Sequence, residues 1–307
     1  MASRTWIGGD GNNEANNPNN WSPTGAPQPG DVLADSLAGS TMDIRDDALA
    51  GAPLTAFSGV TINLSHFATV NLTVPIGDFS PVTVHATGID TLNAVLQADT
   101  APAPNAVLDV NLDHAILFGS FNLGFIGKET ITSTGGHSVF INNATDVLNG
   151  GRAIIDVDVL GHGAFDLSFG TGHDAAVEGA TLEFGGRVSR SQSVSVAGGS
   201  ASPNGTLPPV TSSVKIDRPT EFFGTVDLHD LSVADLVGLS QADSWSYKND
   251  LLSIRNTCGK VIDRLHVVSD ASSTGSIHGL SVSQTAAGEV LVSPGTDFHG
   301  SLMLPMT

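Results

Sequence analysis

The sequence predicts an all-β protein, and within that class a right-handed parallel β-solenoid (β-helix) with a cap at its N-terminus. Three observations predict it. Short segments of alternating apolar and polar residues, closed by Gly, Asp or Pro, recur from about residue 44 to residue 268, and helical pattern is nearly absent. The chain is 40% hydrophobic but only 6% aromatic, so its core is built from the small branched residues that stack in thin strand layers. No segment is long enough to bury a face alone, so the segments must stack on one another.

Residues 1–35 differ from the rest of the chain. They are rich in Asn, Gly and Pro, and the two tryptophans Trp6 and Trp21 flank the Asn-rich part. We expect a capping segment, because the end of a solenoid exposes an unpaired strand edge and an open core that two indoles could cover. The alternative is that Trp6 and Trp21 bind a ligand by stacking on sugar rings.

Residues 36–307 are predicted to form the solenoid itself. In stretches such as Val60–Leu64 the apolar side chains point one way and the Asn, Asp, Thr and Ser side chains the other. A Gly/Ser/Pro-rich loop at 198–213 interrupts the stack, and Ser232–Val237 is expected to form one helical turn capped by Ser232. An antiparallel sandwich or barrel would give similar spacing. The lack of a strong Asn-Gly hairpin pattern favours the solenoid.

The charge balance excludes several kinds of partner. The chain has 12 Lys and Arg against 31 Asp and Glu, a net charge of −19. Nucleic-acid binding depends mainly on Lys and Arg contacts to phosphate, and docking on anionic lipid also needs positive charge. An acidic surface fits a secreted protein that takes up Ca²⁺, and it fits equally well a surface that simply keeps the protein soluble.

No feature of the sequence points to a membrane span or to an intrachain disulfide. The single cysteine, Cys258, cannot form an intrachain disulfide and lies in an expected hairpin turn, Asn256–Gly259. The longest apolar runs are far too short to span a bilayer, so no membrane insertion is expected. The first residues contain no apolar signal-peptide region. An extracellular or cell-surface location is therefore expected by a route without a visible N-terminal signal peptide.

Several motifs resemble known repeats. Trp6-Ile7-Gly8-Gly9-Asp10-Gly11 and Asn20-Trp21-Ser22-Pro23-Thr24-Gly25-Ala26-Pro27 resemble the N-terminal repeat of large bacterial surface proteins. Ala180–Gly186 is similar to the "gtLelgg" repeat of autotransporter passengers and related adhesins. Phe223-Gly224-Thr225-Val226 followed by Ala234–Leu239 resembles the module that comes after it. The resemblance covers both ends and much of 180–268, and it implies a parallel β-solenoid, export, and a role at a cell surface or in a matrix. The calcium-binding nonapeptide array of some such proteins is not in this sequence.

Acidic residues on the outward strand face are the sharpest polar pattern. Their spacing of two residues places them on one side of a strand, and adjacent coils of a solenoid lie about 4.8 Å apart, so carboxylates from neighbouring coils could meet. In an enzyme they would supply paired acid and base groups, and Ca²⁺ prefers the same oxygen ligands. Plain solvation explains them as well, since outward positions must be polar. The candidate catalytic residues are Asp109, Asp113, Asp156 and Asp158, and the candidate calcium ligands are Asp109, Asn111, Asp113, Asp156 and Asp158.

Trp245 and Tyr247 alternate on one face of a predicted strand. They could form a platform for a sugar or a stack inside the structure.

The function that these features favour is an extracellular, non-catalytic scaffold or adhesin-like module that contacts surface or matrix polysaccharide. The first alternative is a carbohydrate-active β-helix enzyme, a glycosidase or polysaccharide lyase, that uses the outer-face carboxylates. The second is a segment of a phage tail fibre or spike, which a stable trimer would support. No cofactor is expected apart from calcium, and the sequence leaves a homo-oligomer open.

Overall fold

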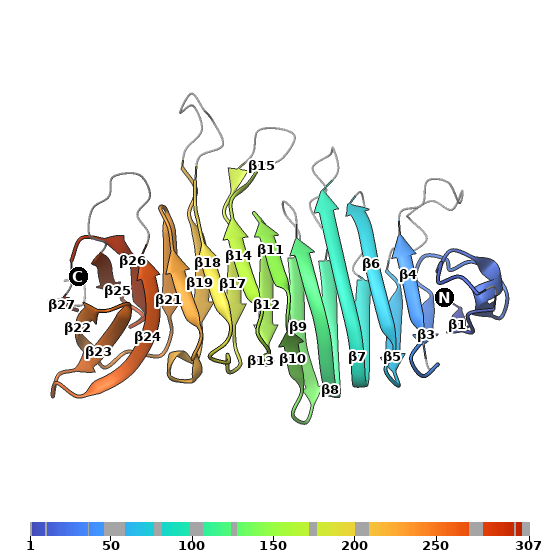
Figure 1. Ribbon diagram of the computed structural model, residues 1–307, viewed down its shortest axis with the longest axis horizontal. Coiled ribbons are helices and arrows are strands. Elements are labelled where there is room, and N and C mark those ends of the chain that lie inside the picture. Colours follow the sequence, from blue (N-terminus) through green and yellow to red (C-terminus); the bar gives the residue numbers. More distant parts are fainter. Residues whose placement is uncertain are drawn as a thin grey trace.

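The computed structural model describes residues 2–9, 11–35, 37–45, 59–76, 82–98, 107–123, 128–171, 177–199, 209–269, 279–297 and 299–302. The molecule is elongated, with the N-terminus near one end and the C-terminus near the other (Figure 1). A mixed 25-stranded sheet wraps nearly closed around the core, and β15 and β16 form a separate two-stranded sheet. Helical structure in the described ranges is limited to two 3-10 turns, η1 and η3. The all-β class is confirmed.

The strands follow one another along the chain with little else between them. Their bounds are β1 Ser3–Trp6, β2 Trp21–Ser22, β3 Val32–Asp35, β4 Thr41–Arg45, β5 Thr61–Ser65, β6 Thr69–Ile76, β7 Val82–Ala98, β8 Val107–Leu123, β9 Lys128–Gly135, β10 Val139–Asn142, β11 Thr145–Asn149, β12 Arg152–Asp156, β13 Asp158–Leu160, β14 Ala164–Ser168, β15 Gly170–Thr171, β16 Val177–Glu178, β17 Thr181–Phe184, β18 Ser193–Val196, β19 Ser212–Ile216, β20 Thr225–Leu228, β21 Ser232–Leu236, β22 Ala242–Lys248, β23 Leu251–Asn256, β24 Val261–Ser269, β25 Gly279–Gln284, β26 Val290–Gly295 and β27 His299–Ser301. The 3-10 turns are η1 Pro18–Asn20 and η3 Pro219–Glu221.

Parallel pairing joins the strands from β3 to β21, except for β15 and β16, which pair antiparallel with each other. Each residue pairs with a residue on a later strand of the chain, as Val139 does with Asp158 and Thr181 with Ser213. Each step adds a strand beside the previous one, which extends the molecule along its long axis (Figure 1). The two longest strands, β7 and β8, bend where the backbone has positive φ, at Gly88 (98°) and His114 (51°).

The alternation expected from the sequence is present in the strands. In β8, Leu108, Val110 and Leu112 are buried, while Asp109 and Asn111 between them are half-buried on the outer side. An aromatic column continues the same inner face further on. Its ring centroids are 5.2 Å apart between Phe165 and Phe184 and 5.8 Å apart between Phe184 and Phe222. The period of two along each strand therefore sets which side chains enter the core.

Buried polar side chains satisfy backbone N–H groups between neighbouring strands. In each case, a side chain accepts a hydrogen bond from an N–H that lies 22 to 32 residues earlier in the chain. This matters because an unpaired buried N–H is costly. The pairs are Asp90 with Ala68 (3.1 Å), Ser138 with Ala115 (3.3 Å), Asp146 with Phe121 (2.7 Å) and Ser212 with Ala180 (3.2 Å).

The C-terminal strands pair differently. β22 and β23 form an antiparallel hairpin, β23 pairs antiparallel with β24, and β25 pairs antiparallel with β26. The β22–β23 turn has two residues, Asn249 (φ 52°) and Asp250 (φ 59°), which is the geometry of a type I′ hairpin turn. The parallel pairing expected over 36–307 is therefore wrong for these strands, and the turn that folds them back is marked by Asn-Asp in place of Asn-Gly. The expected hairpin turn at Asn256–Gly259 is confirmed.

Two further expectations meet the structure. The helical turn at Ser232–Val237 is wrong, because Ser232–Leu236 is strand β21 and its alternation buries Ala234 and Leu236. Tertiary burial of those two apolar side chains outweighs the weak capping signal of Ser232. Of the loop expected at 198–213, residues 200–208 lie outside the described residues, Gly199 bridges Val210, and β19 begins at Ser212.

Candidate functional site

The four candidate catalytic aspartates lie on the outer face but at separate positions. Asp109 pairs with Thr83 and Thr130 on its neighbouring strands, and Asp156 pairs with Thr132. These two carboxylates are thus two strands apart, about 9.6 Å, with a further offset of two residues along the strand. Asp113 lies at the end of its row, beside Gly135. Asp158 is in a different row, beside Val139. No hydrogen bond joins any two of the four among the described residues.

Three of these five polar side chains have a local partner instead. Asp113 Oδ1 lies 2.7 Å from His114 Nδ1 on an exposed corner. Asp158 Oδ1 accepts the backbone N–H of Arg187 at 2.9 Å, and Asn111 Oδ1 accepts the Thr132 hydroxyl at 3.0 Å. Asn111 and Asp158 therefore bond to neighbouring segments, whereas Asp113 contacts the residue that follows it. No group of three or more His, Cys, Asp or Glu side chains within the described ranges is close enough to hold a metal ion, and the calcium site stays a prediction.

The four candidate sugar-binding aromatic residues are buried. The exposed fraction is 1% for Trp6, 0% for Trp21, 4% for Trp245 and 7% for Tyr247. Trp6 and Trp21 pack edge to face at 5.1 Å, and Trp21 Nε1 donates to the carbonyl of Ala15 at 2.7 Å. A stacked sugar needs an exposed ring face, and none of the four offers one in this structure. All four side chains are part of the hydrophobic core.

Two buried carboxyl groups lie inside the molecule, where the sequence analysis did not look for them. Glu129 is 1% exposed and Asp146 is fully buried. Burial raises the pKa of Asp146 to about 8, against a weaker opposing effect of the hydrogen bond from the Phe121 N–H. Burial, with a contribution from Asp146, holds the pKa of Glu129 well above its ordinary value. The sequence did contain a signal for Glu129, because it lies two residues before Ile131 and therefore on the same inward face of β9. Both groups are core acids that favour the protonated form.

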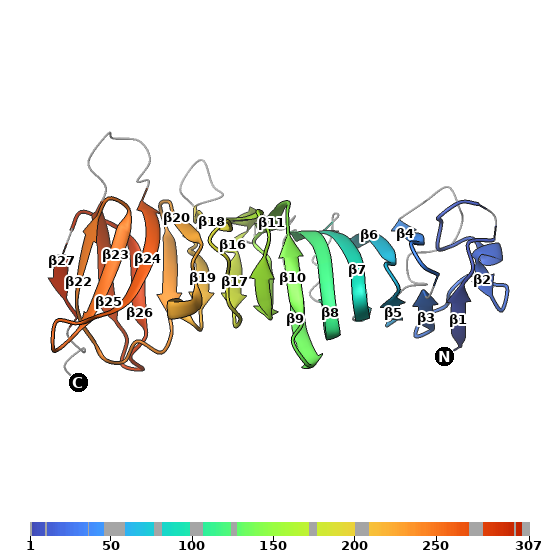
Figure 2. The same cartoon turned by 60° about the horizontal axis from the view of Figure 1, so that its bottom comes forward.

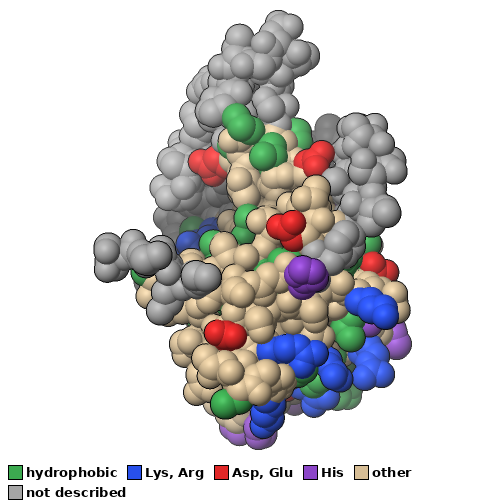
Figure 3. All heavy atoms as spheres, turned by 90° about the vertical axis from the view of Figure 1, so that its left-hand side faces the viewer, with side chains coloured by type: hydrophobic (Ala, Val, Ile, Leu, Met, Phe, Trp, Pro, Cys, Tyr) green, Lys and Arg blue, Asp and Glu red, His purple; other side chains and the backbone are tan. Residues whose placement is uncertain are grey.

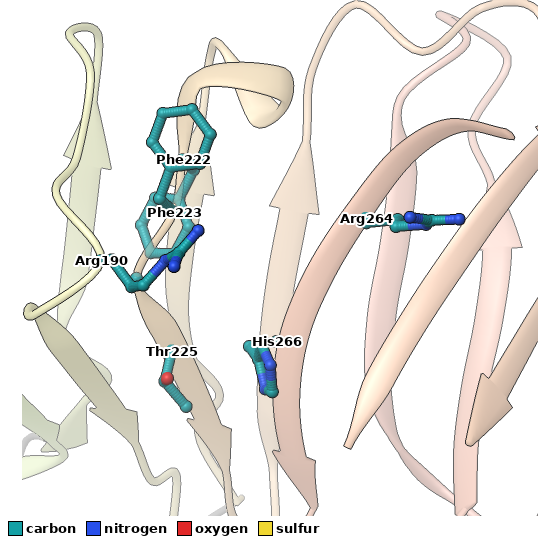
Figure 4. A pocket seen from close by; sticks show the side chains of 7 residues that line it. Arg190, Phe222, Phe223, Thr225, Arg264 and His266 are labelled. Atoms are coloured by element: carbon teal, nitrogen blue, oxygen red, sulfur yellow. The ribbon is translucent and has the colours of Figure 1, made fainter. Parts of the chain in front are cut away.

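A pocket of about 360 Å³ lies where the parallel strands meet the C-terminal hairpins. It forms between the turn that precedes β18, the segment from η3 to β20, and β24 (Figure 4). Parallel pairing sets Thr225 on β20 directly beside His266 on β24. The lining residues are Arg190, Phe222, Phe223, Gly224, Thr225, Arg264 and His266.

The Phe222-Phe223 pair supplies the apolar wall of this pocket. Phe222 is 2% exposed and joins the aromatic column in the core, whereas Phe223 is 42% exposed. The guanidinium of Arg187 lies 5.2 Å from the centre of the Phe223 ring, a cation–π contact. Gly224 lets the backbone lie close to Gln192, since a Cβ at this position would lie 2.8 Å from the Gln192 carbonyl oxygen.

The basic groups of the pocket lack carboxylate partners. No described Asp or Glu lies within ion-pair distance of Arg190 or Arg264, whereas Arg218 nearby pairs with Glu221 at 3.7 Å. Arg190 and Phe223 both line the pocket, and Arg264 lies across from Arg190 on β24 with its guanidinium directed away from Arg190 (Figure 4). The pocket therefore presents two separate positive groups, an exposed ring, a hydroxyl and an imidazole.

Basic residues concentrate in this part of the chain. Residues 187–264 contain eight of the 12 Lys and Arg but only eight of the 31 Asp and Glu, so this stretch is neutral. Residues 1–186 contain four Lys and Arg and 20 Asp and Glu. Seen from the C-terminal end, Lys and Arg side chains gather on one side of the molecule, with histidines among them (Figure 3). The net charge of the whole chain conceals this difference.

The sequence analysis missed the pocket although two signals were present. The arginine spacing was one, because the positive charges fall in the one long stretch without an acidic excess. The Phe222-Phe223 doublet was the other, because two adjacent rings in a strand-like segment must point to opposite sides. The positions of Arg190 and Arg264 relative to Phe223 needed the tertiary structure.

The comparisons with known proteins add no relative. No protein-family model, curated protein or solved structure matches the chain. None of the described helical segments has the length and apolar character that a membrane crossing requires.

Proposed function

We propose that the protein is a non-catalytic scaffold or adhesin-like module, built on a right-handed parallel β-solenoid, that contacts polysaccharide at a cell surface or in a matrix. One observation carries the proposal: parallel pairing continues from strand to strand over most of an elongated molecule (Figure 2). Such a body keeps its outer surface in a fixed, extended arrangement, which suits contact with a long polymer.

The outer surface supports this proposal. Asn71, Asn93 and Ser120 occupy one half-buried row across neighbouring strands. The row begins at the buried Asp43, and the four side chains are linked in sequence. The hydrogen bonds measure 2.7 Å from Asn71 Nδ2 to Asp43, 2.9 Å from Asn93 Nδ2 to Asn71 and 3.4 Å from the Ser120 hydroxyl to Asn93. A row of short amide and hydroxyl groups offers a polymer regularly spaced polar contacts. The resemblance to surface-protein and autotransporter repeats supports the proposed location.

The arrangement of acids favours this function over a glycosidase or lyase. The enzyme alternative needs two carboxyl groups about 5–10 Å apart that face one substrate bond. Here the outer-face aspartates lie in separate rows, and two of them are engaged by neighbouring groups, Asp158 by the Arg187 N–H and Asp113 by His114.

A mixing experiment tests the proposal. The protein is combined with each member of a panel of neutral and acidic polysaccharides and passed over a size-exclusion column with light-scattering detection. We expect one or more polymers to co-elute with the protein at unchanged polymer size. A fall in polymer size that Asp156→Asn abolishes would show an enzyme instead. Co-elution with no member of a broad panel would also overturn the proposal.

A further inference from the structure

We infer that the pocket between β20 and β24 binds the anionic groups of an acidic polysaccharide, with Arg190 and Arg264 on the charges and Phe223 against a sugar ring. The anionic group is a carboxylate, as in a uronic acid, or a sulfate ester. The polysaccharide class rests on the proposed function, and the pocket and its charge rest on the structure alone.

The charge at the pocket favours an anionic ligand. Arg190 and Arg264 line the pocket without a carboxylate partner among the described residues, in a protein that carries a net charge of −19. Four other cations, Arg4, Arg152, Lys215 and Arg218, each pair with a carboxylate, as Lys215 does with Glu183 at 2.7 Å. The acidic excess lies in residues 1–186, and charges more than about 8 Å away are largely screened at physiological salt. An anion at the pocket is therefore governed by the local positive groups.

The side chains that line the pocket are complementary to a sugar that carries a carboxylate or a sulfate. The planar guanidinium group presents paired N–H donors that match the two oxygens of a carboxylate or sulfate. The 42% exposed ring of Phe223 supplies an apolar surface for the C–H face of a pyranose, while the Arg187 contact orders the ring. The Thr225 hydroxyl and the His266 imidazole lie next to each other on paired strands and can bond sugar hydroxyls. The volume of about 360 Å³ lies in the lower part of the usual range for small-molecule sites.

The separation of the two arginines favours a ligand longer than one small anion. Arg190 and Arg264 lie on opposite walls, and the Arg264 guanidinium is directed away from Arg190 (Figure 4). A single small anion would engage one arginine at a time. A chain with a charge on successive sugars can engage both, so the geometry favours a polymer over inorganic phosphate or sulfate.

The test uses the full chain at 0.15 M salt and isothermal titration calorimetry. The probes are polygalacturonate oligosaccharides, the same oligosaccharides after reduction of their carboxyl groups, sulfated galactan oligosaccharides, sodium sulfate and single-stranded DNA. The variants are Arg190→Ala/Arg264→Ala, Phe223→Ala and Arg190→Lys. The matched control is Arg152→Ala, which removes an exposed arginine from the acidic part of the molecule.

We expect an acidic oligosaccharide to bind at least tenfold more tightly than the carboxyl-reduced one or sodium sulfate. The double variant should lose roughly tenfold or more, because charge-assisted hydrogen bonds are lost. Phe223→Ala should weaken binding several-fold, and Arg190→Lys should fall between wild type and the double variant because it keeps the charge but not the fork. Arg152→Ala should bind like wild type. A melting temperature close to that of wild type checks that each variant is folded.

The outcomes separate the two proposals. Selective binding of the uronate or of the sulfated oligosaccharide identifies the anionic group and supports the inference in either case. Equal binding of the neutral oligosaccharide, tighter binding of DNA, or affinity that the double variant does not change would overturn the inference while polysaccharide contact elsewhere on the scaffold could still hold. If no polysaccharide binds in this experiment or in the column experiment, both proposals fail.

Discussion

The strands from β3 to β20 and those from β22 to β27 differ in the way they gain neighbours. In the first region, apart from the antiparallel pair β15 and β16, the strands pair in parallel with earlier and later strands of the chain, as Thr181 does with Arg152 and Ser213. In the second, hairpins fold back on themselves, as β22 does on β23 through a two-residue turn. A parallel partner needs a long connection between strands, whereas a hairpin partner needs only a turn.

The difference explains where a pocket forms. In the parallel region, equivalent side chains stand in rows and bond to one another, which leaves a nearly even polar surface. At the junction, β24 pairs in parallel with β20 and antiparallel with β23, so side chains from distant segments converge beside Thr225. The junction therefore provides a concave site that is lined by two arginines.

The largest expected effect compares one core ring from each region. Phe184→Ala removes the middle of the aromatic column and should lower the free energy of unfolding by about 3–5 kcal/mol. Because stacked strands contact mainly their neighbours, hydrogen exchange should accelerate around β14, β17 and β19 more than in the hairpins. Trp245→Ala should have the reverse distribution. Equal acceleration along the whole chain after either change would show one cooperative unit and remove the distinction.

The second expected effect is a difference in pH dependence. Burial raises the pKa of Asp146 to about 8 and that of Asp263, on β24, to about 6, from 3.8 in both cases. Between pH 3.8 and the raised pKa, the folded state keeps a proton on the aspartate that the unfolded chain has released. The free energy of unfolding therefore falls as the pH rises through this range. Opening free energies from hydrogen exchange should therefore decrease near β11 from about pH 4 to 8, by up to about 1.4 kcal/mol per pH unit, and near β24 only up to about pH 6. Asp146→Asn should reduce the slope of the first profile alone and leave the part due to Glu129, whose pKa burial also raises. An unchanged profile would contradict the assignment.

The third comparison uses two buried glutamines. Gln192 Nε2 donates to the carbonyl oxygens of Asn142 (2.9 Å) and Leu160 (2.8 Å), which lie on earlier strands of the parallel region. Gln284, among the hairpins, makes the same kind of contacts at 3.4 Å. Shorter bonds should be stronger, so we expect Gln192→Ala to cost about 2 kcal/mol and Gln284→Ala about half as much in denaturant unfolding. Equal costs would show that the two regions depend on such bridges to the same degree.

The smallest expected effect concerns the outer row. Asn93→Ala removes the links to Asn71 and Ser120 and should cost under about 1 kcal/mol, because these groups are partly exposed to water. Thermal unfolding measures it, with Asn122→Ala as the control because Asn122 is half-buried on the same strand face as Ser120. A loss as large as that of Phe184→Ala would mean that the row, and not the core, holds the parallel region together.

The sequence alone determined the all-β class, the positions of many strands and the face that each one buries, because alternation is a local property of the chain. It also indicated the Asn256–Gly259 turn for the same reason. The burial of Trp6, Trp21, Trp245 and Tyr247 was decided by the tertiary structure, since residue type does not reveal what covers a ring.

The pairing direction and the pocket were likewise decided by the tertiary structure. Arg190, Thr225 and Arg264 are each separated by more than 30 residues, and only strand pairing places them around one cavity. The outward aspartates show the converse: their regular spacing was readable in the sequence, but two strands and a register offset separate Asp109 from Asp156. Spacing along one strand fixes a face, whereas the register between strands fixes which side chains meet.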